Sequence, residues 1–213
     1  DIHVDGARRV AEAARREGVA RLLHLSGIGA DAAARSPYVR SRGEGEVAVR
    51  QEFEQAVIFR PSVMVGPDDA LLSGLAALIG RLPVLPLFGR GETRLQPVFV
   101  GDVAEAAARA LTSGQPPAPL YELGGPDIVS YRQLIGLVAR RSGCRPLLLP
   151  VPFPLWGGIT MLAGLLPSPP LTEGQVALMK RDNVAAPALP GLAELGVAPT
   201  PLAAVLERGV DAG

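Results

Sequence analysis

Three polar residues in the first part of the chain could support proton transfer to a carbonyl substrate. Ser26 stands at the end of a predicted strand, and Tyr38 and Arg42 lie four residues apart in a predicted helix. That spacing places both side chains on one helix face. A cation beside a phenol stabilises the phenolate, so Tyr38 could act as a general acid while the Ser26 hydroxyl orients a carbonyl oxygen. In the alternative without chemistry, Arg42 pairs with Glu46 on a solvated face and Tyr38 is a half-buried packing residue.

Two segments match the letters of a dinucleotide-binding fingerprint, Gly27-x-Gly29-x-x-Ala32 and Gly43-x-Gly45-x-x-Ala48. The fingerprint needs a long helix that starts at its third position, so that a pyrophosphate lies at the helix N-terminus. Ser36 and Pro37, however, begin a new helix shortly after the first segment, and the second segment lies inside that helix. We therefore interpret both as ordinary loop and helix glycines.

These residues lie in an alternation of helices and short apolar strands. Apolar residues at helical spacing predict a first helix that ends near Gly18: Ile2, Ala7, Val10, Ala11 and Ala14. Residues 19–25 are typical of a strand buried on both faces, a feature of parallel sheets. Ser36 and Pro37 then predict the N-cap and first turn of a helix at 38–54, and a second buried strand follows at 56–59. This order predicts an α/β, doubly wound sheet.

Capping residues mark the later helices. Three pairs match the capping-box pattern: Asp102 with Glu105, Ser130 with Gln133, and Thr172 with Gln175. They predict helices near 102–113, 130–142 and 172–182. Gly114 and Gly143 stand where left-handed C-caps are expected. Residues 120–123 predict another strand, and Thr200 with Pro201 predict the start of a last helix.

The composition excludes several classes of protein. With 213 residues, of which 48% are apolar and 20% charged, the chain is a loop-rich globular protein with room for one core and an appendage. The net charge is zero and the basic residues are scattered, so no nucleic-acid partner is expected. The one cysteine excludes an internal disulfide, and two histidines are too few for a zinc cluster of His and Cys ligands.

No segment is predicted to cross a membrane or to direct secretion. The longest uncharged run, residues 146–172, contains seven prolines, and its unbroken apolar part at 153–166 is too short to span a bilayer. We interpret this run as a lid helix packed on the core. The alternative is a docking surface for a membrane-bound partner or for the bilayer interface. The expected location is cytoplasmic, and peripheral on the inner membrane in the second case.

Several motifs, taken in order, resemble a known family. They are the strand ending at Ser26, Tyr38-Val-Arg-Ser-Arg42, Arg60-Pro61 followed by Gly66-Pro67, and Gln96-Pro97-Val98-x-Val100-x-Asp102-Val103-Ala104. This series resembles the short-chain dehydrogenase/reductase superfamily. The later segments resemble one atypical branch, that of the NAD(P)H-binding accessory subunit of respiratory complex I and its bacterial relatives: Tyr121-Glu-Leu-Gly-Gly-Pro126, Ser130-Tyr131-Arg132 and Lys180-Arg-Asp-Asn183.

The resemblance implies site residues and a cofactor. The catalytic and cofactor-binding triplet corresponds to Ser26, Tyr38 and Arg42, and the loop facing the nicotinamide carboxamide corresponds to Pro61, Ser62 and Val63. The implied cofactor is NADP or NAD. Two departures limit the analogy. The chain starts after the family's first βα units, about 90 residues with the glycine-rich turn that holds the pyrophosphate, and Arg42 replaces the lysine of the family's Tyr-x-x-x-Lys.

We therefore predict the second half of a Rossmann-type parallel sheet at 1–143, with cleft-covering insertions after residue 66, and a small, mostly helical substrate or docking region at 144–213. The predicted function is an NAD(P)-binding accessory or assembly protein related to the complex I subunit, catalytically weak or inactive. Two alternatives stay open: an NAD(P)-dependent reductase or epimerase acting on a small or lipid-like carbonyl substrate, and a redox-sensing binding module. Expected partners are a dinucleotide and complex I or the membrane surface. The open edge of the strand at 19–25 also predicts self-association.

Overall fold

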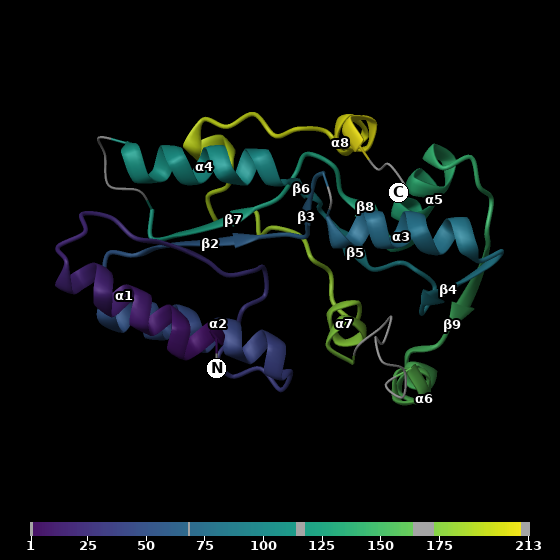
Figure 1. The fold of residues 1–213 in the computed structure, drawn as a ribbon, viewed down its shortest axis with the longest axis horizontal. Helices are drawn as coiled ribbons and strands as arrows, with labels where there is room; N and C mark the ends of the chain where they lie inside the picture. Colours follow the sequence, from purple (N-terminus) through teal and green to yellow (C-terminus); the bar gives the residue numbers. More distant parts are fainter. Residues whose placement is uncertain (1, 68, 114–117, 164–172, 210–213) are drawn as a thin grey trace.

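The computed structural model describes residues 2–67, 69–113, 118–163 and 173–209. A parallel sheet lies at its centre, with strands β1 (Leu23–Leu25), β2 (Val57–Pro61) and β7 (Leu120–Leu123) in the order β1-β2-β7. Within the sheet, Leu23 pairs with Val57 and Phe59 pairs with Tyr121. This sheet and the helices around it confirm the predicted α/β, Rossmann-type architecture (Figure 1).

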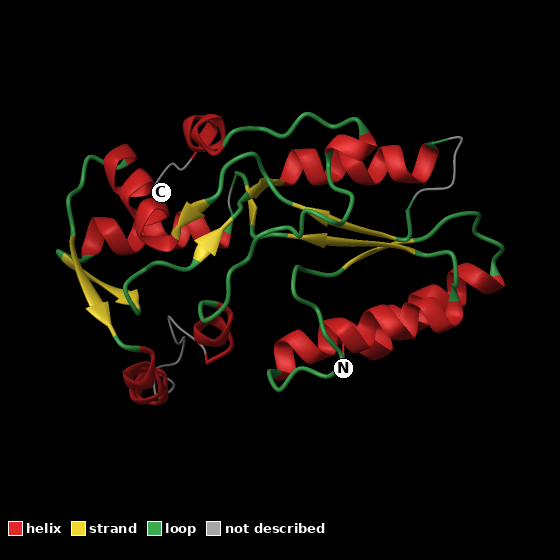
Figure 2. Ribbon diagram, turned by 180° about the vertical axis from the view of Figure 1, so that it is seen from behind, coloured by secondary structure: helices red, strands yellow, loops and turns green. Residues whose placement is uncertain are grey.

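Helices cover both faces of the central sheet (Figures 1 and 2). One face carries the π-helical turn η1 (Ile2–Gly6), α1 (Ala7–Arg16) and α2 (Pro37–Glu52). The other face carries α4 (Val100–Thr112) and the short 3-10 helix η2 (Ala193–Leu195). The sheet is therefore the middle layer of three.

Neighbouring residues of β2 serve different cores, because successive side chains of a strand point to opposite faces. Ile58 is fully buried against Ala11 of α1 and Val49 of α2. Phe59 is fully buried in the other core, together with Val103 of α4. β2 therefore packs against the helical layers on both faces of the sheet.

A further core lies beside the central sheet. It contains α3 (Ala70–Arg81), α5 (Tyr131–Arg141) and a ribbon of two parallel strands, β4 (Val84–Phe88) and β9 (Leu147–Val151). Helices α6 (Phe153–Ala163), α7 (Glu173–Leu178) and α8 (Leu202–Gly209) surround this core. β9 lies in the region predicted to be mostly helical. None of the described helices is long and apolar enough to cross a membrane.

Two short strand pairs connect the cores. β3 (Met64–Val65) pairs in parallel with β6 (Val98–Phe99), and β5 (Arg94–Leu95) pairs antiparallel with β8 (Val129–Ser130). β3 comes directly after β2, and β6 runs into α4. The β3–β6 pair therefore anchors the loop that follows β2.

Several local predictions are confirmed. Ser130 and Gln133 form the predicted capping box at the start of α5. Gly18 and Gly143 adopt the left-handed backbone expected of C-caps, both with φ of +66°. The strand at 120–123 and the last helix are also present. The predicted features at Gly114 and Thr172 lie outside the described residues.

Other local predictions are wrong. The run at 19–25 is not a strand buried on both faces: β1 has three residues, and Leu25 is 48% exposed, because β1 pairs with β2 alone in the described sheet. The apolar spacing of the first helix marks its buried face only in part: Ala11 is buried and Ala7 and Ala14 are half-buried, whereas Ile2 and Val10 are exposed.

The predicted capping box at Asp102 is also absent. α4 begins at Val100, so Asp102 lies inside the first turn. Its carboxylate accepts hydrogen bonds from the Thr200 N–H (2.6 Å) and the Thr200 Oγ (2.8 Å). A tertiary contact has therefore taken the place of the local cap.

The uncharged run starts as β9 and α6. Trp156 of α6 is buried, and its ring lies 4.4 Å from that of Phe88. This supports the interpretation of α6 as a helix packed on the core.

Candidate functional site

Ser26 directly follows β1 and lies at the carboxyl end of the parallel sheet. Its N–H donates to the carbonyl oxygen of Phe59 over 2.7 Å, which continues the pairing of β1 with β2. The residue is only 4% exposed. Open α/β sheets bind their ligands at the carboxyl ends of their strands, so this position is a candidate site on topology alone.

Helix α2 brings Tyr38 and Arg42 to the same place. Pro37 starts the helix, so Tyr38 lies in its first turn and Arg42 one turn later. The Arg42 Nη1 donates to the carbonyl oxygen of Ser26 over 2.7 Å, and the guanidinium carbon lies 4.9 Å from the centre of the Tyr38 ring. The structure therefore brings the three predicted site residues together. The guanidinium contacts the face of the Tyr38 ring as a cation–π pair.

Two buried polar atoms at this point have no hydrogen-bond partner among the described residues: Ser26 Oγ and Arg42 Nε. Buried polar groups in folded proteins are almost always hydrogen-bonded, so such atoms call for an explanation. Tyr38 is 39% exposed and opens the site to solvent. The three residues thus present a hydroxyl, a guanidinium N–H and a phenol, a set that fits a ligand carrying hydroxyl or carbonyl oxygens.

The predicted loop Pro61, Ser62 and Val63 lies beside the Ser26 loop. The Pro61 carbonyl accepts a hydrogen bond from the Ile28 N–H over 3.1 Å. The Ser62 hydroxyl and the Val63 N–H both donate to Oδ1 of Asn183, the latter over 3.0 Å. Asn183 was not singled out as a site residue from the sequence. Only tertiary structure could reveal this contact, because Asn183 lies 120 residues from Val63.

The suggested pair of Arg42 with Glu46 is wrong. Glu46 is buried and accepts two hydrogen bonds from Arg60, over 2.8 and 2.7 Å. Arg60 also lies 3.8 Å from the carboxylate of Glu122, whose Oε2 accepts the N–H of Ala186. The hydrogen bonds that it donates to Glu46 raise the pKa of Arg60, against the opposing effect of burial. This buried cluster ties α2, β2 and β7 to the carboxy-terminal segment.

The glycines of the two fingerprint-like segments have packing roles. A Cβ at Gly43 would overlap the backbone nitrogen of Ala32, and a Cβ at Gly45 would overlap the His3 carbonyl oxygen. Gly29 turns its loop with φ of +81°, well before α2 begins. These observations agree with the interpretation of ordinary loop and helix glycines.

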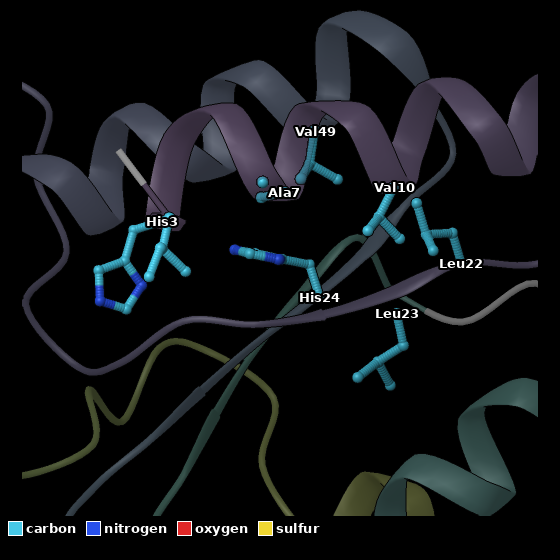
Figure 3. Close-up of a pocket in the computed structure, with 9 residues that line it drawn as sticks. His3, Ala7, Val10, Leu22, Leu23, His24 and Val49 are labelled. Atoms are coloured by element: carbon cyan, nitrogen blue, oxygen red, sulfur yellow. The ribbon is translucent and has the colours of Figure 1, made fainter.

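A hollow of about 390 Å³ opens beside β1, beneath η1 and α1 (Figure 3). Its lining is mostly apolar and includes Val10, Leu22 and Val49, and the His24 ring extends toward α1. Burial lowers the pKa of His24; Arg42 lowers it further, while Glu46 opposes the shift. The hollow therefore favours an uncharged imidazole and offers few polar groups to a ligand.

A second hollow, of about 730 Å³, lies among β5, the end of β7 and residues 182–199. The polar side chains at its wall are bonded within the chain. Gln96 accepts the Ala185 N–H, Asp182 pairs with Arg94, and Glu194 accepts the Gly191 N–H. These groups hold the segment in place, and they make this hollow a weaker candidate than the Ser26 site.

A parallel sheet between two helical layers, with polar residues at the carboxyl ends of its strands, defines a Rossmann-type α/β fold. Residues 1–124 match the NAD dependent epimerase/dehydratase family, and the chain belongs to that family. This result confirms the resemblance to the short-chain dehydrogenase/reductase superfamily.

Curated relatives narrow the comparison. The chain is 33% identical to NADH dehydrogenase (ubiquinone) 1 alpha subcomplex subunit 9, mitochondrial, of Rattus norvegicus, over 95% of this chain and 54% of that protein. It is 28% identical to the mitochondrial NADH-ubiquinone oxidoreductase 40 kDa subunit of Neurospora crassa, over 95% of this chain and 53% of that protein. It is 35% identical to the ceramide reductase of Caulobacter vibrioides, over 72% of this chain and 48% of that protein. The chain thus spans about half the length of these relatives.

Solved structures show the same fold. UDP-glucose 4-epimerase of Thermotoga maritima matches with a TM-score of 0.70 and 17% identity, over 99% of this chain and 68% of that one. UDP-glucose 4-epimerase of Thermus thermophilus, solved with NAD, matches with a TM-score of 0.67 and 22% identity, over 99% of this chain and 69% of that one. At these identities the likeness concerns the fold alone.

Proposed function

We propose that this chain belongs to an NAD(P)-binding accessory or assembly protein, related to the respiratory complex I subunit and catalytically weak or inactive. One observation carries the proposal: Arg42 stands where the family has a catalytic lysine, and its Nη1 is bonded to the Ser26 carbonyl oxygen at 2.7 Å. The similarity to two mitochondrial subunits of the complex supports the same conclusion.

The physical difference between lysine and arginine explains the weak catalysis. A lysine ammonium is a compact charge that can turn toward a cofactor hydroxyl and a neighbouring phenolate, whereas a guanidinium is a planar fork with fixed directions. In this structure one arm of the fork is used by Ser26, and the face of the Tyr38 ring lies against the guanidinium carbon. Arg42 keeps the positive charge of the family's lysine, but its guanidinium is held in contacts with Ser26 and Tyr38 that suit binding rather than proton transfer.

The nicotinamide end of NADP or NAD fits the residues that are present. Ser26, Tyr38 and Arg42 would hold it on one side, because Ser26 Oγ and Arg42 Nε are buried without a partner among the described residues. Pro61, Ser62 and Val63 would form the other wall, with Ser62 and Val63 already fastened by Asn183. When bound, the nicotinamide ring supplies hydride transfer. In the described residues, no helix begins at either glycine-containing segment to receive a pyrophosphate.

The proposal includes a location and partners. We expect a cytoplasmic protein that is peripheral on the inner membrane and contacts complex I or the membrane surface. In the sheet formed by the described residues β1 is an edge strand, which supports self-association as a further proposal, since an edge strand can pair with another chain.

Nucleotide titration tests the central proposal. NADH and NADPH fluorescence would be followed with the 213-residue chain and with the protein expressed from its complete gene. We expect weak binding by the 213-residue chain, because none of its described helices begins at a glycine-containing segment that could receive a pyrophosphate, and tight binding without turnover of carbonyl substrates by a protein that supplies such a helix. Micromolar or better affinity of the 213-residue chain would contradict the expectation and redirect attention to Gly27 and Gly29. Absence of binding to the complete protein would refute the proposed function.

A second candidate function, an NAD(P)-dependent reductase or epimerase of a small or lipid-like carbonyl compound, is favoured by one feature of the site. Ser26 Oγ has no partner among the described residues, and Arg42 contacts both the Ser26 carbonyl oxygen and the ring of the exposed Tyr38, so a hydroxyl and a phenol flank one cation. The identity with a ceramide reductase supports it as well. Carbonyl reduction by the complete protein, abolished in a Tyr38→Phe variant, would establish this function instead.

A further inference from the structure

The ribbon of β4 and β9 has one apolar face that the described residues leave open. The ribbon lies at one end of the long axis of the molecule (Figure 1). Its register pairs Val84 with Leu147 and Pro86 with Leu149, and these four side chains are all exposed. Leu147 and Leu149 are 66% and 52% exposed. Directly paired residues of a parallel ribbon point to the same face, so the four form one contiguous apolar surface.

The opposite face of the ribbon fixes this surface in place. Leu85 and Leu87 alternate with the exposed Val84 and Pro86 and are buried in the core that contains α3 and α5; at the end of the strand, Phe88 is covered by Trp156 of α6. Turning the apolar face inward would therefore expose this core. Immediately after β9, α6 adds one more exposed apolar side chain, Leu155.

The chain segments that form this surface carry charges of one sign. Residues 70–91 and 128–172, which contain α3, β4, α5, β9 and α6, include no Asp or Glu. Arg81 ends α3 just before β4, and Arg145 lies just before β9. Since the two strands are parallel, both arginines lie at the same end of the ribbon. None of the ion pairs seen in the described chain involves Arg81, Arg140, Arg141 or Arg145.

We infer that this face, Val84, Pro86, Leu147 and Leu149 with Arg81 and Arg145 at its rim, docks on a lipid bilayer that carries anionic headgroups. An apolar patch bordered by unpaired cations matches the boundary of acyl chains and phosphates. A second copy of the chain does not match it. A two-fold interface through this face would bring arginines of both copies together without a carboxylate to pair with them.

This inference specifies the membrane location contained in the proposed function, and it uses none of the nucleotide-site residues. An experiment can therefore refute the docking surface or the nucleotide-binding proposal without refuting the other. Vesicle binding without nucleotide binding would refute the nucleotide proposal alone, and nucleotide binding without vesicle binding would refute the docking surface alone.

Cosedimentation with vesicles tests the docking surface. The complete protein would be mixed with vesicles of phosphatidylcholine alone and of phosphatidylcholine with phosphatidylglycerol. We expect binding to the anionic vesicles, a loss of roughly tenfold in the Leu147→Ser, Leu149→Ser double variant, and a comparable loss in the Arg81→Gln, Arg145→Gln double variant. The matched controls are Val10→Ser with Val47→Ser, and Arg9→Gln with Arg35→Gln, all at exposed positions far along the chain from the ribbon.

Three outcomes would overturn the inference. These are no binding to anionic vesicles, equal losses in the patch and control variants, and a dimer in sedimentation velocity that the Leu147→Ser, Leu149→Ser variant abolishes. The last outcome would assign the face to a second copy. Unchanged thermal unfolding of each variant shows that the loss concerns the surface and not the fold.

Discussion

Arg60 holds the carboxylate of Glu46 with two parallel hydrogen bonds, of 2.8 Å from Nε and 2.7 Å from Nη2. Glu46 belongs to α2, the helix of Tyr38 and Arg42, and Arg60 belongs to β2. A bidentate pair fixes both distance and orientation. The position of α2 over the Ser26 site is therefore set by a side-chain pair that does not itself touch the site.

Removing the charge of Glu46 should destabilise the protein more than removing a comparable charge on the surface. In a Glu46→Gln variant Arg60 loses its bidentate ionic partner in a mostly buried place and keeps only the longer contact with Glu122, and we expect a fall of about 3 kcal/mol in the free energy of unfolding. Glu44→Gln is the control, because Glu44 pairs with Arg40 on the exposed side of the same helix. We expect the control to cost below about 0.5 kcal/mol. Urea unfolding measures both, and equal costs would contradict the role given to Glu46.

Arg42→Lys tests whether the site has kept its catalytic capacity. The substitution restores the family residue and frees the Ser26 carbonyl from the guanidinium. We expect Arg42→Lys to create or raise turnover only if the rest of the site is intact. We expect Tyr38→Phe, which keeps a ring against the guanidinium, to leave thermal stability and nucleotide affinity nearly unchanged. Steady-state assays of the complete protein with NADPH and carbonyl substrates provide the measurement. New or increased activity in Arg42→Lys, abolished by adding Tyr38→Phe, would show an intact site and support the reductase alternative.

His24 should make stability depend on pH. Burial lowers the pKa of His24 below its ordinary value of 6.5, so an unfolded chain takes up a proton that the folded protein resists. Its contribution to stability is present above that ordinary value and is lost as the pH falls through the lowered one. We expect the free energy of unfolding to fall less between about pH 7.5 and about pH 5 in His24→Gln than in the wild type. Identical pH dependence of the two proteins would show that His24 does not contribute to the pH dependence of stability.

Neighbouring residues of α6 should respond in opposite ways to the same substitution. Trp156 is buried against Phe88, and its Nε1 donates to the Val151 carbonyl, whereas Leu155 is exposed. We expect Trp156→Ser to cost about 3–5 kcal/mol of folding free energy, and Leu155→Ser to stay within about 0.5 kcal/mol of the wild type. Thermal and denaturant unfolding would show the difference. A small effect of Trp156→Ser would mean that α6 is not fastened to the core.

The sequence by itself determined the features that depend on neighbours along the chain. Helical spacing, the capping box of Ser130 with Gln133 and the left-handed glycines Gly18 and Gly143 are local, and the structure confirms them. The order of helices and strands can also be read along the chain, and their alternation indicated a parallel sheet. The spacing of Tyr38 and Arg42 was sufficient to place both on one face of α2.

Tertiary structure alone decided which side chains became partners. Glu46 pairs with Arg60 and not with Arg42. Asp102 accepts a hydrogen bond from Thr200, 98 residues away, instead of capping α4. The Val63 N–H donates to Asn183, 120 residues away. Each choice depends on the distance between elements after folding, which no local pattern contains. The apolar run at 19–25 likewise predicted a fully buried strand, although burial depends on the neighbours that a strand acquires in the sheet. An apolar sequence records a preference for burial, and the packed structure decides whether that preference is met.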